Sequence, residues 1–128
     1  MTRILIADDE ERVVKSIRSF LEKRGVYVNF AFDGKQALDL IKKNVYDIAF
    51  LDHNMPELTG LELIKFIKQN KPKMKTIMIS GYPGMREFFA KAVGADEYLT
   101  KPCSLKDIER IVDKYSDRRG KFRRIKYS

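Results

Sequence analysis

Hydrophobic residues gather along the chain in five short runs, and after each run they recur at a wider, helical spacing. The runs, which are typical of buried strands, cover residues 3–7, 26–31, 48–51, 76–79 and 97–100. The last run is short and less apolar, so we expect it at an edge of the sheet. Strands that alternate with helices in this way predict a parallel sheet with helices on both faces.

The stretches between the strands predict five helices. The first covers about residues 10–24 and ends at Gly25, a typical C-terminal cap, and the last covers residues 105–115 behind a capping box of Ser104 and Asp107. Three further helices are identified by their apolar positions, which are Ala37, Leu38 and Ile41, then Leu61, Ile64, Phe66 and Ile67, and more weakly Phe88, Phe89, Ala92 and Val93. The simplest topology for these elements is a doubly wound, flavodoxin-like α/β sheet of order 2-1-3-4-5.

Acidic residues follow two of the predicted strands directly. Asp8 and Asp9 come after residues 3–7, and Asp52 comes after residues 48–51. In the predicted order these strands are neighbours, so the three carboxylates converge at the edge where open parallel sheets bind ligands. Their repulsion, roughly 1 to 4 kcal/mol per pair, is offset either by uptake of protons or by a hard divalent cation, and we favour Mg²⁺. Alternatively, the acids near Asp8 only cap the first helix, which leaves Asp52 unexplained.

A hydroxyl and a lysine end the last two strands. Ser80 follows residues 76–79, and Lys101 follows residues 97–100 and can reach over the sheet edge. Taken singly, Ser80 is a turn or cap residue and Lys101 a solvated surface residue. Together with Asp52 they suit phosphoryl transfer, which requires the protein mainly to place groups and neutralise charge, with Asp52 as the nucleophile.

Composition and charge narrow the class of protein further. A chain of 128 residues with 44% hydrophobic residues forms one domain, and its one cysteine, Cys103, excludes an internal disulfide framework. The chain lacks a signal-peptide pattern and any run of about 20 apolar residues, so we expect a cytoplasmic protein without a membrane segment. The net charge of +8 lies mostly after residue 113, which separates a domain of residues 1–117 from a basic tail or linker of residues 118–128.

The ordered set of motifs resembles the receiver domain of two-component response regulators from residue 3 to about residue 117. The motifs are Asp8-Asp9, Asp52-His53-Asn54-Met55-Pro56 with Gly60, Ser80-Gly81, Tyr98 and Lys101-Pro102. The resemblance implies that Asp52 accepts a phosphoryl group from the phosphohistidine of a sensor histidine kinase. It also implies that Asp9, Asp52 and the backbone carbonyl of Asn54 hold Mg²⁺, and that Asp8 contributes largely through a bound water.

The resemblance further implies a switch that a second protein reads. Ser80 would turn toward the phosphorylated Asp52 and Tyr98 would move inward, which remodels the face formed by the fourth helix, the last strand and the last helix. The expected partners are the kinase, an output protein or output domain, and a second copy bound on phosphorylation. Such a protein catalyses only its own phosphorylation and dephosphorylation and is not a metabolic enzyme. His53 is interpreted as a local variant, and Cys103 as a packed loop residue rather than a redox sensor.

Two other functions compete with a stand-alone switch. A phosphohydrolase of the haloacid-dehalogenase type uses similar groups, but its nucleophile follows the first strand, and it has an acid two positions later, where this chain has Asn54. Alternatively, the chain is the receiver part of a DNA-binding regulator whose output domain is absent, and residues 118–128 contact nucleic acid through basic and aromatic side chains. Without an output domain, contact with nucleic acid is the less favoured interpretation.

Overall fold

A five-stranded parallel sheet forms the centre of the computed structural model, which describes residues 1–81 and 85–116. The strand order is β2-β1-β3-β4-β5, as the sequence predicts. The strands are β1 (Arg3–Ala7), β2 (Tyr27–Ala31), β3 (Ile48–Asp52), β4 (Lys75–Ser80) and β5 (Glu97–Thr100). β5 lies at one edge of the sheet, as expected from its length, and β2 lies at the other.

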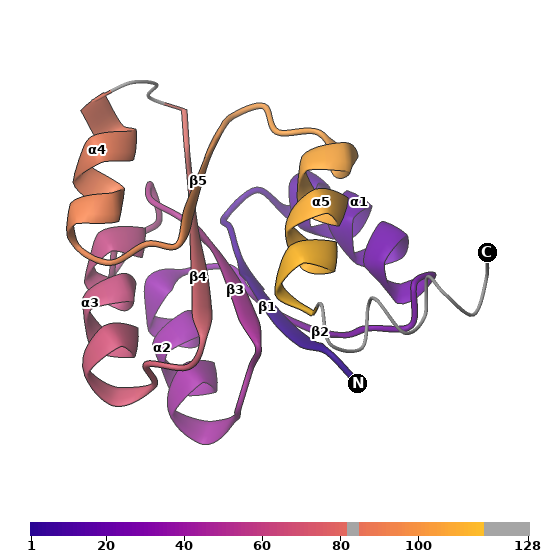
Figure 1. Cartoon of the computed structure of the whole chain (residues 1–128), viewed down its shortest axis with the longest axis horizontal. Helices are drawn as coiled ribbons and strands as arrows, with labels where there is room; N and C mark the ends of the chain where they lie inside the picture. Colours follow the sequence, from indigo (N-terminus) through magenta and orange to yellow (C-terminus); the bar gives the residue numbers. More distant parts are fainter. Residues whose placement is uncertain (82–84, 117–128) are drawn as a thin grey trace.

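Five helices cover the two faces of the sheet. They are α1 (Glu11–Glu22), α2 (Gly34–Lys43), α3 (Gly60–Asn70), α4 (Met85–Ala92) and α5 (Leu105–Tyr115). α2, α3 and α4 lie on one side of the sheet, and α1 and α5 lie on the other (Figure 1). The doubly wound α/β fold is therefore confirmed. The predicted tail, residues 118–128, and the boundary at residue 117 lie outside the described residues.

The sheet separates two hydrophobic cores. Side chains alternate along a strand, so in β3 Ala49 and Leu51 pack toward α2, α3 and α4, whereas Ile48 and Phe50 pack toward α1 and α5. All five residues of β3 are buried, which explains why this strand reads as an uninterrupted apolar run. β3 is thus the central strand, and its last residue, Asp52, emerges between the two cores.

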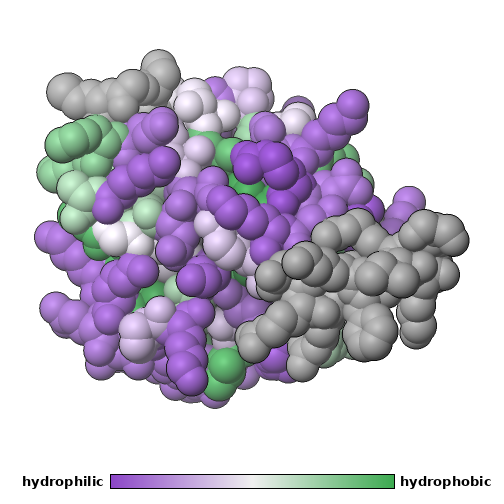
Figure 2. Space-filling model, viewed as in Figure 1, coloured by the Kyte–Doolittle hydropathy of each residue, from purple (hydrophilic) through white to green (hydrophobic). Residues whose placement is uncertain are grey.

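The apolar positions of α4 differ from the predicted pattern. Phe88 and Phe89 are 80% and 51% exposed, whereas Ala90 is buried. Figure 2 shows the resulting hydrophobic patch over α4, on a surface that is otherwise mostly hydrophilic from this side. Ala90 allows α4 to lie close to the sheet, so the larger aromatic residues are left on the outside. Phe88 and Phe89 therefore form a hydrophobic part of the surface and are not core residues.

Candidate functional site

Backbone hydrogen bonds hold the predicted site residues in line with the ends of their strands. The N–H of Asp8 donates to the carbonyl of Ala31 at 3.0 Å, which extends the β1–β2 pairing by one residue. The N–H of Lys101 donates to the carbonyl of Ser80 at 2.8 Å and extends the β4–β5 pairing in the same way. Asp52 is itself the last residue of β3. Sheet-type hydrogen bonds thus hold the backbone at all three positions.

The Lys101 side chain brings the acidic residues together. Its Nζ lies 3.1 Å from Oδ2 of Asp52, 3.4 Å from Oδ2 of Asp8 and 3.0 Å from Oε1 of Glu10. Burial disfavours the charged ammonium, but the hydrogen bonds to Glu10 and Asp52 and the charges of Asp8 and Asp52 outweigh it and raise the pKa of Lys101. Lys101 therefore stays protonated at any physiological pH.

Asp8 is an acidic residue held in an unfavourable environment. Asp8 is 1% exposed, and its Oδ1 accepts a hydrogen bond of 2.8 Å from the N–H of Glu10. Burial is the largest cause that raises the pKa of Asp8 to about 6, and the nearby Asp52 adds to it, while the Glu10 N–H and Lys101 act in the opposite direction. A second positive charge beside Asp8 would relieve this strain.

The acidic residues fit a divalent cation. Asp8, Asp9 and Asp52 each offer one carboxylate oxygen, and these oxygens all lie within 4.8 Å of one another. Asp8 and Asp52 are buried, while Asp9 is exposed, so the group opens toward solvent on one side. Hard oxygen ligands beside solvent suit Mg²⁺, which usually keeps several of its waters. The donor set therefore agrees with the cation that the sequence predicts.

The loop after β3 is fixed by close backbone contacts. The N–H of Asn54 donates to Oδ1 of Asp52 at 3.1 Å, and the N–H of Gly34 donates to the carbonyl of Pro56 at 3.1 Å. A Cβ atom at Gly34 would overlap the carbonyl oxygen of Leu58, so only glycine allows α2 to approach this loop. These contacts hold the backbone beside Asp52 in place.

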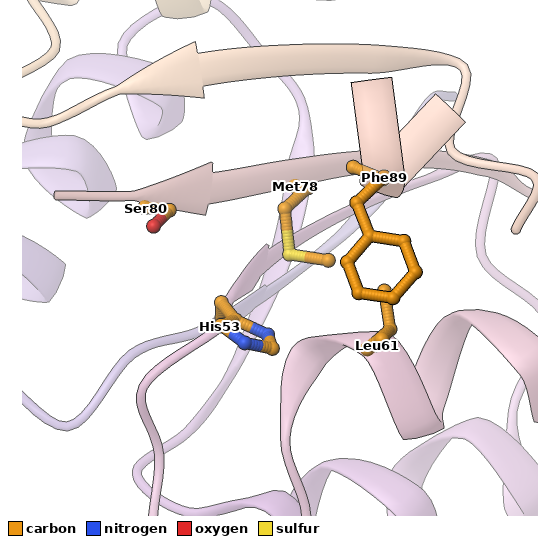
Figure 3. Close-up of a pocket in the computed structure, with 6 residues that line it drawn as sticks. His53, Leu61, Met78, Ser80 and Phe89 are labelled. Atoms are coloured by element: carbon orange, nitrogen blue, oxygen red, sulfur yellow. The ribbon is translucent and has the colours of Figure 1, made fainter. Parts of the chain in front are cut away.

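A small cavity lies behind the site, between the sheet, α3 and α4. Its volume is about 10 Å³, room for one water molecule, and its lining comprises His53, Leu61, Met78, Ser80, Phe89 and Ala90. Figure 3 shows the His53 ring beside Met78, with Phe89 and Leu61 farther along and Ser80 at the end of its strand. His53 thus lines this cavity together with residues of α3, β4 and α4, and its interpretation as a local variant stays a prediction.

Tyr98 and Cys103 lie on opposite sides of the sheet. Tyr98 is half-buried on β5 and packs against the core beneath α2, α3 and α4. Cys103 is partly buried against the other core, and burial raises the pKa of its thiol. A raised thiol pKa lowers the thiolate fraction, so Cys103 fits the predicted packed loop residue. Cys103 also lines an open groove of about 1150 Å³ that runs from Asp8 and Lys101 along α1.

Glu10 is a site residue that the sequence does not reveal. Within the described part of the chain it is the N-cap residue of α1, but its side chain makes no capping hydrogen bond and reaches Lys101 instead. An acid in the first turn of a helix normally needs no explanation beyond the helix dipole. The available signal is that glutamate stands where Ser, Thr, Asp or Asn is preferred.

An open parallel sheet with acids, a hydroxyl and a lysine at its carboxyl edge defines an α/β domain that handles phosphoryl groups. Residues 4–113 match the family description of the response regulator receiver domain, and the chain belongs to this family. The class of function is therefore a phosphorylation-dependent signalling switch. Membership in this family also removes the phosphohydrolase alternative.

Curated relatives extend beyond the matched domain. The chain is 36% identical over 107 residues to response regulator MprA of Mycobacterium sp. (strain KMS), a match that covers 83% of the chain and 46% of MprA. It is 32% identical over 108 residues to response regulator ArlR of Staphylococcus saprophyticus, with 84% of the chain and 49% of ArlR covered. The chain spans about half the length of the curated relatives it matches.

Solved structures agree with the fold. The receiver domain of the Francisella response regulator 1452 superimposes with a TM-score of 0.87 at 32% identity, over 92% of this chain and 98% of that domain. Response regulator TrrA of Thermotoga maritima, solved in complex with Mg²⁺ and BeF, superimposes with a TM-score of 0.80 at 30% identity, over 90% of this chain and 99% of TrrA. Among the described residues, no helix combines the length and apolar character needed to cross a membrane.

Proposed function

We propose that Asp52 accepts a phosphoryl group from the phosphohistidine of a sensor histidine kinase in the cytoplasm. An oxygen of the Asp52 carboxylate attacks phosphorus, and the new O–P bond forms while the P–N bond to the kinase histidine breaks. The histidine nitrogen keeps the electron pair of the broken bond. The observation that carries the proposal is the 3.1 Å contact between Lys101, which follows β5, and the buried Asp52 at the end of β3.

Lys101, Asp8, Asp9 and Asn54 prepare Asp52 for this reaction. Lys101 places a permanent positive charge where the negative charge of the phosphoryl oxygens accumulates. Asp8, Asp9 and Asp52 with the backbone carbonyl of Asn54 would hold Mg²⁺, Asp8 largely through a water. Mg²⁺ supplies charge neutralisation at the phosphoryl oxygens. The high pKa of Asp8 supports this assignment, since a cation would stabilise the carboxylate form.

Ser80 and Tyr98 would convert phosphorylation into a change of surface. The Ser80 hydroxyl would donate a hydrogen bond to a phosphoryl oxygen, and Tyr98 would move inward on the same side of the sheet. Ser80 is fully buried beside the small cavity at α4, which supports its access to a second position. The exposed Phe88 and Phe89 support a face at α4, β5 and α5 that an output protein or a second copy reads.

Intact mass of the protein before and after incubation with acetyl phosphate and Mg²⁺ tests the proposal. We expect one added phosphoryl group in the wild type and none in Asp52→Asn. Asp39→Asn, which changes an exposed aspartate of α2, is the matched control and should be modified like the wild type. A wild type that stays unmodified, or an Asp52→Asn protein labelled at the wild-type rate, contradicts the assignment.

A second candidate function is suggested by the relatives, about half of whose length the chain spans. In this case the domain of residues 1–117 is the receiver part of a longer DNA-binding regulator, and residues 118–128 begin its linker and contact nucleic acid. Salt-dependent retention on DNA that is lost on deletion of residues 118–128 would support this candidate. Equal elution of both proteins at all salt concentrations would exclude contact by the tail.

A further inference from the structure

We propose that Glu10 is a positioning residue that competes with the phosphoryl group for Lys101. The inference rests on the proposed function, because it concerns the same lysine. Glu10 Oε1 lies 3.0 Å from Lys101 Nζ, the shortest of the three contacts of this ammonium with carboxylates. In the unphosphorylated protein Glu10 therefore already binds the Lys101 ammonium, which the phosphoryl group also needs.

The number of donors makes the contacts compete. A lysine ammonium has three N–H donors, and three carboxylates lie within 3.4 Å of Lys101 Nζ. A phosphoryl group on Asp52 adds acceptor oxygens at the position that Lys101 already serves. The phosphoryl group can take over the donor that now serves Asp52, and any further phosphoryl oxygen that contacts Lys101 displaces Asp8 or Glu10.

Glu10 is the partner that can leave at least cost. The Asp8 side chain is 2% exposed and is held by the N–H of Glu10, so it has little freedom to move away. The Glu10 side chain is 58% exposed, and water can solvate its carboxylate once it swings out. Loss of the Glu10–Lys101 contact is thus the expected local consequence of phosphorylation.

The position of Glu10 in the fold argues against a purely structural role. As the N-cap residue of α1 it would stabilise the helix if its side chain accepted a hydrogen bond from the first turn, and Asp or Ser does so better than Glu. Within the described residues the Glu10 side chain makes no such bond. The chain therefore has, at a capping position, a longer acid that reaches across to β5.

Three variants separate the contact from general charge effects. Glu10→Gln removes the charge, while Glu10→Asp keeps it but shortens the side chain by one methylene, about 1.5 Å, and so withdraws it from Lys101. Glu11→Gln is the matched control, because Glu11 lies next to Glu10 in the same exposed turn but pairs with Lys15 at 3.6 Å. Both positions, Glu10 and Glu11, are exposed, so all three variants should fold.

The affinity for beryllofluoride in saturating Mg²⁺, measured by calorimetric titration, is the main readout. We expect Glu10→Gln and Glu10→Asp to bind about two- to five-fold more tightly than the wild type, as loss of one partly exposed competitor implies, and Glu11→Gln to change little. The ¹⁵N shift of the Lys101 ammonium, recorded without metal, should change in both Glu10 variants and remain at the wild-type value in Glu11→Gln.

Each other result overturns the inference in a distinct way. Unchanged binding in Glu10→Gln shows that Glu10 does not compete with the anion, and weaker binding shows that Glu10 supports its binding. If Glu10→Gln binds beryllofluoride more tightly but Glu10→Asp binds it like the wild type, the effect comes from the charge of Glu10 and not from its contact with Lys101. An equal gain in affinity in Glu11→Gln leads to the same conclusion. A wild type that binds no beryllofluoride refutes the proposed function itself, and the competition with it.

Discussion

Nζ of Lys101 lies 3.1 Å from Oδ2 of Asp52, although 49 residues separate them and β4 lies between their strands. The lysine side chain crosses over the end of β4, which is where Ser80 lies. An anion attached to Asp52 would therefore lie between a lysine and a hydroxyl. The first two predictions follow from the charges in this arrangement.

Lys101→Ala should uncouple phosphorylation from the surface at α4. The fold should persist, because Lys101 lies at the edge of the sheet and Asp8 can take up a proton when its counter-charge is lost. In the wild type, addition of beryllofluoride and Mg²⁺ should shift the backbone amide resonances of α4 and β5. In Lys101→Ala these shifts should largely vanish. Lys114→Ala removes a lysine of α5 that pairs with Glu97 of β5, and this variant should keep the shifts. Identical spectra for both variants would contradict the prediction.

The stability of the metal-free protein should fall as pH rises from about 4 to 6. The pKa of Asp8 is 3.8 in the unfolded chain and about 6 in the folded one, so the folded state binds the proton more tightly. This stabilisation is complete below pH 3.8 and is lost as pH rises through 6, with a magnitude on the order of 3 kcal/mol. Urea unfolding in the presence of a chelator at several pH values measures it.

Asp8→Asn is the control for the pH dependence. Asn has no proton to lose, so most of the slope between pH 4 and 6 should disappear, and the metal-free variant should be more stable than the wild type at pH 7. Mg²⁺ should remove most of this difference, because it stabilises the wild type by about 2.7 kcal/mol at a concentration one hundred times its Kd. An unchanged slope in the variant would show that other groups cause the pH dependence.

Ser80→Thr should stabilise the protein, and Ser80→Val should separate packing from hydrogen bonding. The cavity beside Ser80 has a volume of about 10 Å³, so one added methyl group can fill it and contribute about 0.8 kcal/mol or less. Both variants add that methyl, but only Thr keeps the hydroxyl. Urea unfolding should thus favour Thr, and beryllofluoride affinity should fall in Val alone. Equal affinities would remove Ser80 from the phosphoryl site.

Gly60→Ala should destabilise the protein by about 1 to 3 kcal/mol. A Cβ atom at this first residue of α3 would lie 3.0 Å from the carbonyl oxygen of Asp52 and 3.0 Å from Sδ of Met78, which is closer than most packed contacts, and the Asp52 carbonyl belongs to the backbone of the central strand, which resists a shift. Gly81→Ala is the matched control, since a Cβ there meets no heavy atom of the described residues within 4 Å. Thermal unfolding of both variants gives the comparison, and equal melting temperatures would contradict the predicted crowding.

The fold and the positions of the acids could be predicted because each signal is local. Apolar runs identify strands, and Asp52 marks the point at which β3 leaves the core. Capping residues are equally local, as the Ser104 and Asp107 box at the start of α5 shows. The box of Thr59 and Glu62 at the start of α3 has the same local signal, but it is not among the features predicted above from the sequence.

Contacts that depend on the exact approach of two elements could not be predicted. The exposure of Phe88 and Phe89 depends on how closely Ala90 brings α4 to the sheet. The contact of Glu10 with Lys101 joins residues 91 positions apart through a flexible side chain, and no periodic pattern encodes it. The roles of Ser80 and Tyr98 in a switch remain predictions, and the Ser80 variants above test the first of these roles.

The position of the sheet between two cores determines where partner proteins can bind to this domain. The groove leading to Asp8 and Lys101 opens on the α1 side, whereas the Phe88 and Phe89 patch lies on the α4 side. The groove and the patch lie on opposite faces of the sheet, so a protein bound at one need not cover the other, while Asp52 lies at the strand end between the two cores. One molecule of this protein can thus bind one partner at the groove on the α1 side while a second partner occupies the Phe88 and Phe89 patch on the α4 side.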